Sequence, residues 1–311
     1  MKNKNRAFSL IELSIVVLII GILIAGVTQG SRLVNASKVQ TAQTLTQSSP
    51  VTSISGLALW LETSRDASFI STQTSNATAL TKWYDTNPQS TNNFNHFTSA
   101  SASTTYKTIG INGLPSVSFV GTAASTPYFS GTISPNALSP IKTPYSAYTV
   151  FVVARVTNIS AANTIFYNGT FASNDGFGIQ SSSAGKVSVI GGTSFAATAG
   201  TASAVANAAR IMVATISPNS ALGATATQVV STYVNGTKDG TTTLTGTPVV
   251  TPTVNMYIGN KAAGSAVSDP FIGDISEIIM FDTVLKASDR QAVEQYLGKK
   301  YGIAVNVNTN Y

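Results

Sequence analysis

One carboxylate stands inside an apolar segment at the start of this chain. Glu12 lies within a run that stays mostly apolar from Phe8 to Val27, after a short leader that contains Lys2, Lys4 and Arg6. A carboxylate inside a membrane-length segment costs on the order of 2.5–3.5 kcal/mol even on lenient insertion scales. Such a group indicates a function, and the chemistry it offers is pairing with a cation on a neighbouring helix. The alternative is a side chain that reaches the membrane surface and stays hydrated.

The element that positions Glu12 is predicted to be a membrane-crossing helix. The run from Phe8 to Val27 rises roughly 30 Å as a helix, which is one hydrocarbon core. Basic flanks stay in the cytoplasm, so the rest of the chain is expected outside the cytoplasmic membrane. A cleaved secretory signal has an apolar region of only about 7–15 residues and an A-x-A-like site. Here the run is longer, and residues 26–29 (GVTQ) make a poor cleavage site.

The hexad that starts at Phe8, with sequence FSLIEL, follows a small residue, Ala7. This N-terminus resembles that of type IV pilins and pseudopilins, the substrates of prepilin peptidase. The resemblance implies cleavage between Ala7 and Phe8 and N-methylation of Phe8. It also implies that the new ammonium group of one subunit pairs with Glu12 of its neighbour in a filament core. Residues 1–7 would then be a leader peptide, and residues 8–45 a helix that serves first the membrane and then the filament.

Composition limits the chemistry of the remaining chain. Cysteine is absent, which excludes disulfides, thiol catalysis and cysteine-ligated metal sites. Charged residues make up only 10% of the chain, and three positive charges of the net +6 lie in the leader. No run of Lys or Arg follows the leader, so specific nucleic-acid binding is not predicted.

After a polar linker over residues 46–53, the pattern changes to short strands. Apolar runs occur at residues 148–156, 211–216 and 256–258, and Asn235-Gly236 is typical of a tight hairpin. Residues 181–209 are rich in Ser, Ala, Gly and Thr, and are predicted to form long loops with one strand at 187–190. The fold class predicted is α+β: a long transmembrane helix, an antiparallel β-sandwich and a short C-terminal helix.

Several pieces of residues 54–303 resemble the concanavalin A-like, laminin-G-like jelly-roll family. The matching pieces occur in this order: GLALWL (56–61), TKWYD (81–85), NGLPSVSF (112–119), YVNG (233–236), IGN (258–260) and FIGDISEIIMF (271–281). The resemblance implies one sandwich ectodomain over residues 54–311. The fold alone does not give a function, because lectins, glycosidases and structural modules share it.

Aromatic residues near the start of this domain are candidates for contact with a ligand. Trp60, Trp83 and Tyr84 have rings that can stack on a sugar, and Asp85 follows directly. Large aromatic residues in strands are more often part of a core. Trp83, Tyr84 and Asp85 are therefore retained as candidate ligand contacts beside the interpretation that the rings are core.

Carboxylates were considered as calcium ligands and as catalytic groups. Asp85, Asp274 and Glu277 offer the hard oxygen atoms that calcium prefers, but Asp274 and Glu277 also suit positions that flank strands. Glycosidases need two carboxylates about 5–9.5 Å apart. The glutamates are Glu12, Glu62, Glu277 and Glu294, none in an alternating acidic strand, and His96 is the only histidine. No metal site, cofactor or enzyme activity is predicted, with calcium as the alternative.

The sequence therefore predicts a type IV pilin-like structural subunit. Its helix would polymerise into an extracellular filament, and its sandwich would be displayed on the surface. The alternatives are a minor pilin adhesin that binds a glycan or host protein, and a pseudopilin of a type II-like secretion system. Expected partners are copies of itself, other pilins, prepilin peptidase, the assembly machinery and the membrane. The expected location is the inner membrane before assembly and a cell-surface filament afterwards.

Overall fold

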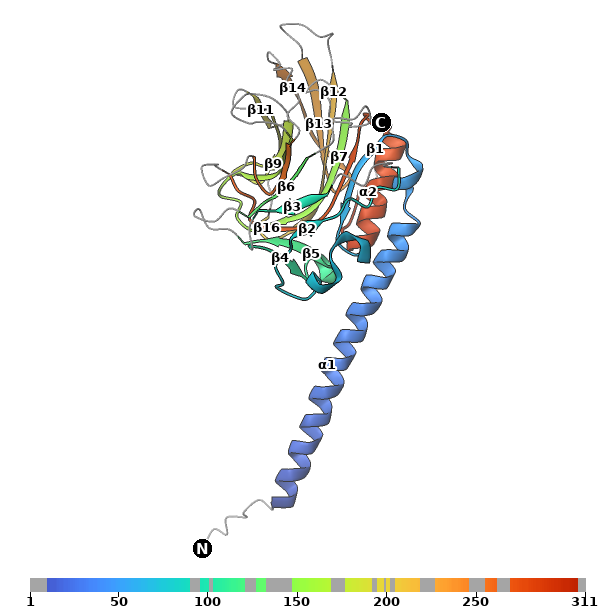
Figure 1. The fold of residues 1–311 in the computed structure, drawn as a ribbon, viewed down its shortest axis with the longest axis vertical. Helices are drawn as coiled ribbons and strands as arrows, with labels where there is room; N and C mark the ends of the chain where they lie inside the picture. Colours follow the sequence, from blue (N-terminus) through green and yellow to red (C-terminus); the bar gives the residue numbers. More distant parts are fainter. Residues whose placement is uncertain are drawn as a thin grey trace, which may run out of the picture.

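A single long helix projects from a β domain, and the C-terminal helix lies beside the point where the two meet (Figure 1). The structure is a computed structural model, and the residues it describes are 10–89, 96–100, 103–120, 127–132, 147–168, 177–191, 195–198, 200–201, 205–218, 227–245, 255–261 and 269–306.

The long helix α1 spans Leu10–Gln47 and is predominantly apolar in its first half. A short 3-10 helix, η1 (Pro50–Ser53), follows it, and the proline at its start cannot continue an α-helix. Three further 3-10 turns lie in the domain: η2 (Asp66–Ser68), η3 (Ser71–Gln73) and η4 (Ile111–Gly113). The C-terminal helix α2 spans Ala287–Tyr301 and ends at Gly302, whose φ of 62° is left-handed.

Among the described residues, the strands form two antiparallel sheets of eight strands each. The first sheet has the order β14 (Thr237–Thr245), β13 (Thr227–Val234), β12 (Ala209–Pro218), β7 (Tyr148–Val156), β16 (Gly273–Phe281), β5 (Ser116–Phe119) and β4 (Thr104–Lys107), with β1 (Leu57–Glu62) also paired to β16. The second has the order β11 (Phe195–Thr198), β10 (Val187–Gly191), β9 (Phe177–Ser181), β8 (Asn163–Asn168), β15 (Asn255–Ile258), β6 (Phe129–Thr132), β3 (Phe97–Ser99) and β2 (Lys82–Trp83).

This arrangement confirms the predicted fold class. The run at residues 148–156 is strand β7, and Asn235-Gly236 forms the hairpin turn between β13 and β14 with φ angles of 50° and 83°. The prediction of loops over residues 181–209 was wrong at residues 195–198, which pair with β10 as strand β11. Small residues and threonine gave that segment little apolar pattern, and its partner strand supplies the ladder that composition does not reveal.

The central strands of the first sheet, β7 and β16, are buried on both faces, which explains their apolar sequences. Val150 and Val152 of β7 face the core between the two sheets, while Phe151 and Val153 face a second core. That second core is closed by α2 and the end of α1, which cover the outer face of this sheet. A strand covered on both faces reads as a continuous apolar run rather than an alternating one. We call α2 and the end of α1 the outer layer of the domain. Contact with α2 holds the end of α1 against the sandwich.

Candidate functional site

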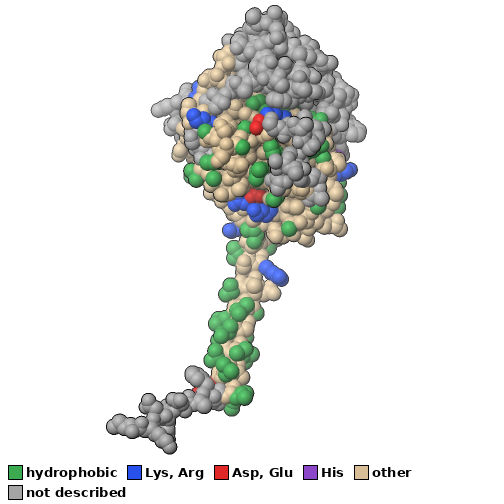
Figure 2. Space-filling model, turned by 90° about the vertical axis from the view of Figure 1, so that its left-hand side faces the viewer, with side chains coloured by type: hydrophobic (Ala, Val, Ile, Leu, Met, Phe, Trp, Pro, Cys, Tyr) green, Lys and Arg blue, Asp and Glu red, His purple; other side chains and the backbone are tan. Residues whose placement is uncertain are grey.

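The first half of α1 exposes a long apolar surface. Its most apolar 18-residue window has a mean hydropathy of 2.9 and no buried residues, so the helix is long and apolar enough to cross a membrane. Leu10 is 83% exposed and Val27 is 73% exposed. Figure 2 shows hydrophobic side chains along the length of this helix below the domain. Apolar surface of this extent marks a membrane or protein contact.

Glu12 lies in the first turn of α1, within this apolar surface. Two hydroxyl side chains in the same segment donate to the helix backbone: Ser14 to the carbonyl of Ile11 at 2.8 Å, and Thr28 to the carbonyl of Ile24 at 2.6 Å. An ionised carboxylate accepts hydrogen bonds only, so helix carbonyl groups cannot serve it in this way. Ala7 and Phe8, the predicted processing residues, lie outside the described residues, and the pairing of Glu12 with Phe8 stays a prediction.

The last turns of α1 are attached to the sandwich by buried contacts. Ala42 and Thr46 are each 1% exposed. The Thr46 hydroxyl lies 3.2 Å from the Tyr296 hydroxyl of α2, and Gln43 Nε2 donates to the carbonyl of Ser64 at 2.8 Å. Val51 of η1 is completely buried just beyond. The projecting helix is thus anchored at one end to the outer layer of the domain.

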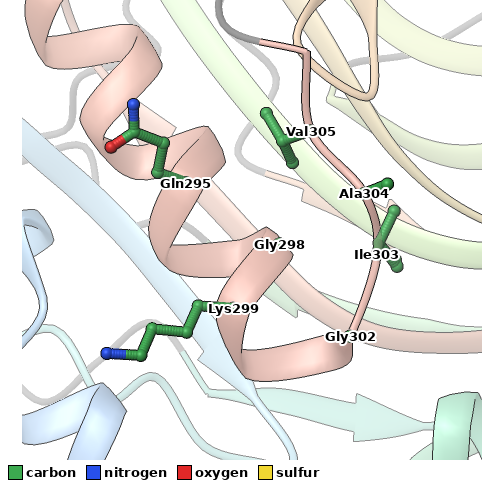
Figure 3. Close-up of a pocket in the computed structure, with 7 residues that line it drawn as sticks. All are labelled: Gln295, Gly298, Lys299, Gly302, Ile303, Ala304 and Val305. Carbon is green, nitrogen blue, oxygen red and sulfur yellow. The ribbon is translucent and has the colours of Figure 1, made fainter.

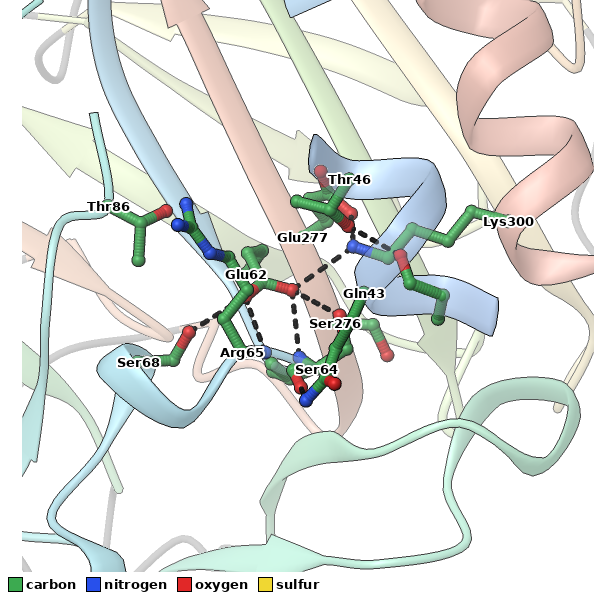
Figure 4. A network of polar contacts seen from close by, with 12 residues as sticks. Gln43, Thr46, Glu62, Ser64, Arg65, Ser68, Thr86, Ser276, Glu277 and Lys300 are labelled. Carbon is green, nitrogen blue, oxygen red and sulfur yellow. Dashed lines mark hydrogen bonds and ion pairs between the residues drawn. The ribbon is translucent and has the colours of Figure 1, made fainter. Parts of the chain in front are cut away.

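A buried ionic cluster lies directly beneath this anchor (Figure 4). Lys300 Nζ of α2 donates to Glu277 Oε2 of β16 at 2.8 Å and to Glu62 Oε2 of β1 at 3.1 Å, and all three side chains are fully buried. Glu277 also accepts three bonds from aromatic donors: Trp60 Nε1 at 2.8 Å, Tyr296 OH at 2.9 Å and Tyr301 OH at 2.9 Å. The cluster therefore joins two strands and a helix that are far apart in sequence.

The second carboxylate of the cluster is satisfied by a local turn. Glu62 accepts bonds from the backbone N–H and hydroxyl of Ser64, the N–H of Arg65 and the hydroxyl of Ser68, at 2.6–2.9 Å. Burial opposes its negative charge, but Lys300 and Ser64 outweigh burial, and the pKa of Glu62 is lowered. The cluster is therefore charged in its resting state and is well supplied with hydrogen bonds.

The pKa of Lys300 is also set by burial and by neighbouring charges, which act on it in opposite directions. Burial alone would lower its pKa, but the carboxylate of Glu277, the two tyrosines and Glu62 together raise the pKa well above its ordinary value. Burial, and then the neighbouring Glu277, raise the pKa of Tyr296 and Tyr301 well above their ordinary values, so both phenols stay protonated donors. Sequence analysis considered Glu62 and Glu277 but missed Lys300, because nothing near Lys300 in sequence signals a partner more than 200 residues away.

The predicted ligand-contact residues have different surroundings. Trp83 is fully buried, and its Nε1 donates to the carbonyl of Glu62 at 3.1 Å. Tyr84 is half-buried with its ring edge against His96, centroids 4.7 Å apart. Asp85 Oδ1 accepts the backbone N–H of Trp60 at 2.9 Å. A ring that has no exposed surface cannot stack on a sugar in this conformation, so of this set only Tyr84 and Asp85 keep exposed surface, and their contact with a ligand stays a prediction.

Two of the three residues considered for calcium, Asp274 and Glu277, are engaged with cations, and the third, Asp85, accepts the backbone N–H groups of Trp60 and Asn87. Asp274 Oδ2 pairs with Arg155 and, at 3.3 Å, with Lys107, whereas Glu277 pairs with Lys300. Within the described part of the chain, no group of three or more His, Cys, Asp or Glu side chains is placed to hold a metal ion.

An open groove of about 520 Å³ lies between the end of α2 and the segment that follows it (Figure 3). It is lined by Gln295, Gly298, Lys299, Gly302, Ile303, Ala304 and Val305. A Cβ atom at Gly298 would lie 2.5 Å from Val305 Cγ2, so glycine lets this segment pack against the helix. Figure 3 shows the Gln295 and Lys299 side chains pointing away from the segment, and we assign no ligand to the groove.

Two family models match the chain. The prokaryotic N-terminal methylation motif matches residues 2–28, and the concanavalin A-like lectin/glucanases superfamily matches residues 130–289. No curated protein matches the sequence of this chain.

Solved structures of low sequence identity share the β-sandwich. Trypanosoma rangeli sialidase in complex with 2,3-difluoro-KDN matches with a TM-score of 0.48 and 15% identity, over 81% of this chain and 34% of the sialidase. Domain 4 of AbnA, an extracellular arabinanase from Geobacillus stearothermophilus in complex with arabinotriose, matches with a TM-score of 0.47 and 15% identity, over 76% of this chain and 97% of that domain. A structure of botulinum neurotoxin type C, whose cell entry depends on interaction with two ganglioside molecules, matches with a TM-score of 0.50 and 14% identity, over 79% of this chain and 52% of the toxin.

These matches correct the prediction that the chain is not an enzyme. Sialidases stand among the structures that share its fold, which contradicts an exclusion drawn from the sequence pattern of carboxylates. The chain spans about a third of the length of those sialidases, at 34% coverage, and the likeness shows a common fold without assigning an activity.

Proposed function

The chain belongs to the concanavalin A-like lectin/glucanases superfamily, and we propose that it is a type IV pilin-like subunit which displays this domain on an extracellular filament. The observation that carries the proposal is the N-terminal methylation motif at the start of a helix whose apolar surface is exposed. In this proposal, residues 1–7 are the leader, 8–45 the assembly helix, 46–53 the linker and 54–311 the displayed domain.

Assembly would move the exposed surface of α1 from lipid to neighbouring helices. Prepilin peptidase would cut between Ala7 and Phe8, and the methylated ammonium of Phe8 would pair with Glu12 of an adjacent subunit. Two opposite charges in a medium of low dielectric constant attract strongly, whereas a single buried charge is penalised. The pair would therefore set the axial position of one subunit relative to the next.

The anchor at the other end of α1 supports this use of the helix. Gln43 and Thr46 bond to different parts of the domain, and Ala42 is buried against it. A helix held at several points transmits its orientation to the domain. Each subunit that joins the filament would thus present its sandwich in the same way.

The proposal is tested by replacing the carboxylate in the assembly helix. Glu12→Leu is expected to enter the inner membrane normally and to abolish fibres, measured by immunoblot of sheared and membrane fractions. Ser14→Leu is the matched control, because it removes a nearby polar group of the same segment without removing a charge. Equal fibre yield from Glu12→Leu and the wild type would contradict the proposal.

A second candidate function is glycan binding by the displayed domain. It is favoured by superfamily membership and by Tyr128, a half-buried ring on the outer face of the second sheet beside Tyr257, which is only 8% exposed. Strand registers place one row of residues across this face: Ile190, Gly178, Tyr167, Tyr257, Ser130, Thr98 and Lys82. The rings of Tyr128 and Tyr257 meet edge to face, with centroids 6.0 Å apart. A neurotoxin that interacts with gangliosides shares the fold.

Glycan-array binding by the full chain in detergent tests this second function. Tyr128→Ala would weaken binding if the outer face of the second sheet is the site, and Tyr84→Ala would do so if the region of Tyr84 and Asp85 is the site. Absence of binding by the wild type to any glycan would remove this candidate. A processed protein confined to the inner membrane would instead favour a pseudopilin.

A further inference from the structure

The buried cluster beneath the anchor has the parts needed for a covalent reaction. We propose that Lys300 and Glu277 become joined by an amide bond between Lys300 Nζ and Glu277 Cδ, with loss of one water molecule. The inference concerns the internal chemistry of the domain, and it does not depend on filament assembly. The geometry, the hydrogen-bond donors and the second carboxylate each support one part of it.

The two reacting groups are held together in a dry site. Lys300 Nζ lies 2.8 Å from Glu277 Oε2, and both side chains are fully buried. The carbon that this nitrogen would attack, Glu277 Cδ, is bonded directly to the oxygen that the nitrogen contacts. Fixed proximity of this kind replaces an improbable encounter in solution and can supply effective molarities of about 10⁵–10⁸ M.

Two donors are placed on the oxygen atom where negative charge would develop. Trp60 Nε1 and the Tyr296 hydroxyl donate to Glu277 Oε1 at 2.8 and 2.9 Å. Attack by nitrogen on Cδ would form a tetrahedral adduct with its charge on Oε1. Donors fixed before the reaction stabilise such an oxyanion without reorganisation. The other oxygen, Oε2, would be the leaving group, and the Tyr301 hydroxyl contacts it at 2.9 Å.

Glu62 provides a route for the protons. Its Oε2 lies 3.1 Å from Lys300 Nζ, so it can take a proton from the ammonium group during attack and return it through the nitrogen, which lies 2.8 Å from Glu277 Oε2. The ammonium has three protons: one stays on the amide nitrogen, and two leave with Oε2 as water. The C–N bond forms as the C–Oε2 bond breaks, no electrons are exchanged with another molecule, and Glu62 ends as it began.

The ionic resting state sets the expected rate. Glu277 and its neighbours raise the pKa of Lys300 despite burial, so the free amine is rare and the reaction is slow. One turnover per molecule is sufficient, because full burial shields the amide from the bulk water that would hydrolyse it. Proton transfer from the ammonium to Glu62 also removes two opposite charges from a dry site, which limits its cost.

The product would strengthen the attachment of the outer layer. It would link β16 covalently to α2, and α2 carries Tyr296, whose hydroxyl contacts Thr46 of the projecting helix. A chain without cysteine has no disulfide with which to fix its C-terminal region. The amide would supply such a link, and it would resist reducing agents.

Mass spectrometry of the wild-type chain purified from its membrane tests the proposal directly. We expect an intact mass lower by one water molecule than the mass calculated for the chain with the N-terminus found in the same sample, N-methylation included. Trypsin does not cut after an acylated lysine, so the peptide that contains Glu277 should be found joined to the peptide that begins at Lys300. Separate peptides with unmodified Glu277 and Lys300 in aged, folded protein would overturn the proposal.

Variants show whether the loss of water comes from this bond or from another reaction. Lys300→Arg keeps a positive charge and cannot form the amide. Lys299→Arg changes the adjacent exposed lysine and should retain the full mass loss. Glu62→Gln should slow formation of the bond by removing the proton carrier. A mass loss that persists in Lys300→Arg, or that maps to Asp239-Gly240 as a succinimide, would overturn the assignment. The wild-type peptide map decides the matter even if a variant fails to fold.

Discussion

Glu294 on α2 gives the folded domain a measurable dependence on pH. Its side chain is fully buried, Arg290 Nη1 donates to its Oε2 at 2.6 Å, and its Oε1 has no hydrogen-bond partner among the described residues. Burial raises the pKa of Glu294 to about 7, and the attraction of Arg290 offsets only part of that effect. The guanidinium group of Arg290 also stacks on the ring of Tyr233, 3.7 Å from its centroid.

The size and sign of the pH dependence follow from the difference between the pKa of Glu294 in the unfolded and in the folded chain. The unfolded chain releases the proton near pH 4.5, and the folded chain releases it only near pH 7. The folded state thus binds more protons between these values, so stability is full below pH 4.5 and falls as the pH rises to 7. At about 1.4 kcal/mol per pKa unit, the free energy of unfolding would fall by about 3 kcal/mol.

Glu294→Gln is expected to remove this loss, because the amide has the same shape and does not ionise. Thermal unfolding followed by circular dichroism at pH 5 and pH 8 measures the effect. From pH 5 to pH 8, the free energy of unfolding of the wild type should fall by about 2–3 kcal/mol more than that of the variant. For a domain of this size, this corresponds to a difference of roughly 4–12 °C in the change of Tm. Asp289→Asn, on the same helix and partly exposed, is the control and should show no such gain. If the free energy of unfolding of Glu294→Gln differed from that of the wild type by the same amount at pH 5 and at pH 8, the reasoning would be refuted.

Three further outcomes are expected. Ala7→Leu should block processing, so an unchanged mature mass would contradict the proposed cleavage site. Thr46→Val removes a buried hydrogen bond at the anchor and should lower the free energy of unfolding by about 0.5–1.5 kcal/mol, measured by denaturant titration. Gly178→Ala should cost about 1–3 kcal/mol, because its Cβ would collide with the backbone carbonyl oxygen of Phe166 and lie 2.7 Å from Tyr167 Cδ2. Gly21→Ala has open space around it and should leave the domain unchanged, so equal losses from both alanines would exclude the steric explanation.

Local patterns predicted the elements well because their causes are local. The apolar run of residues 148–156 is a strand with the same bounds, since it is covered on both faces. Asn235-Gly236 forms its turn because asparagine and glycine tolerate positive φ. The methylation motif at residues 2–28 was predicted from a small residue, a basic leader and one carboxylate within a few positions of each other.

The buried cluster was not predicted because its causes are not local. Glu62, Glu277 and Lys300 come from three elements that only the tertiary fold brings together. In the sequence, Lys300 looks like one more basic residue at the end of a helix, next to exposed Lys299. The burial of Trp83 is a similar case, because an aromatic residue in a short strand suits a core and a binding site equally until its neighbours are known.

The central proposal, that this chain is a processed filament subunit, is tested most directly by N-terminal mass spectrometry of material sheared from intact cells. The account predicts an abundant peptide that begins at N-methylated Phe8. A protein with an intact Met1 end would contradict it and leave a membrane-anchored sandwich outside the filament machinery.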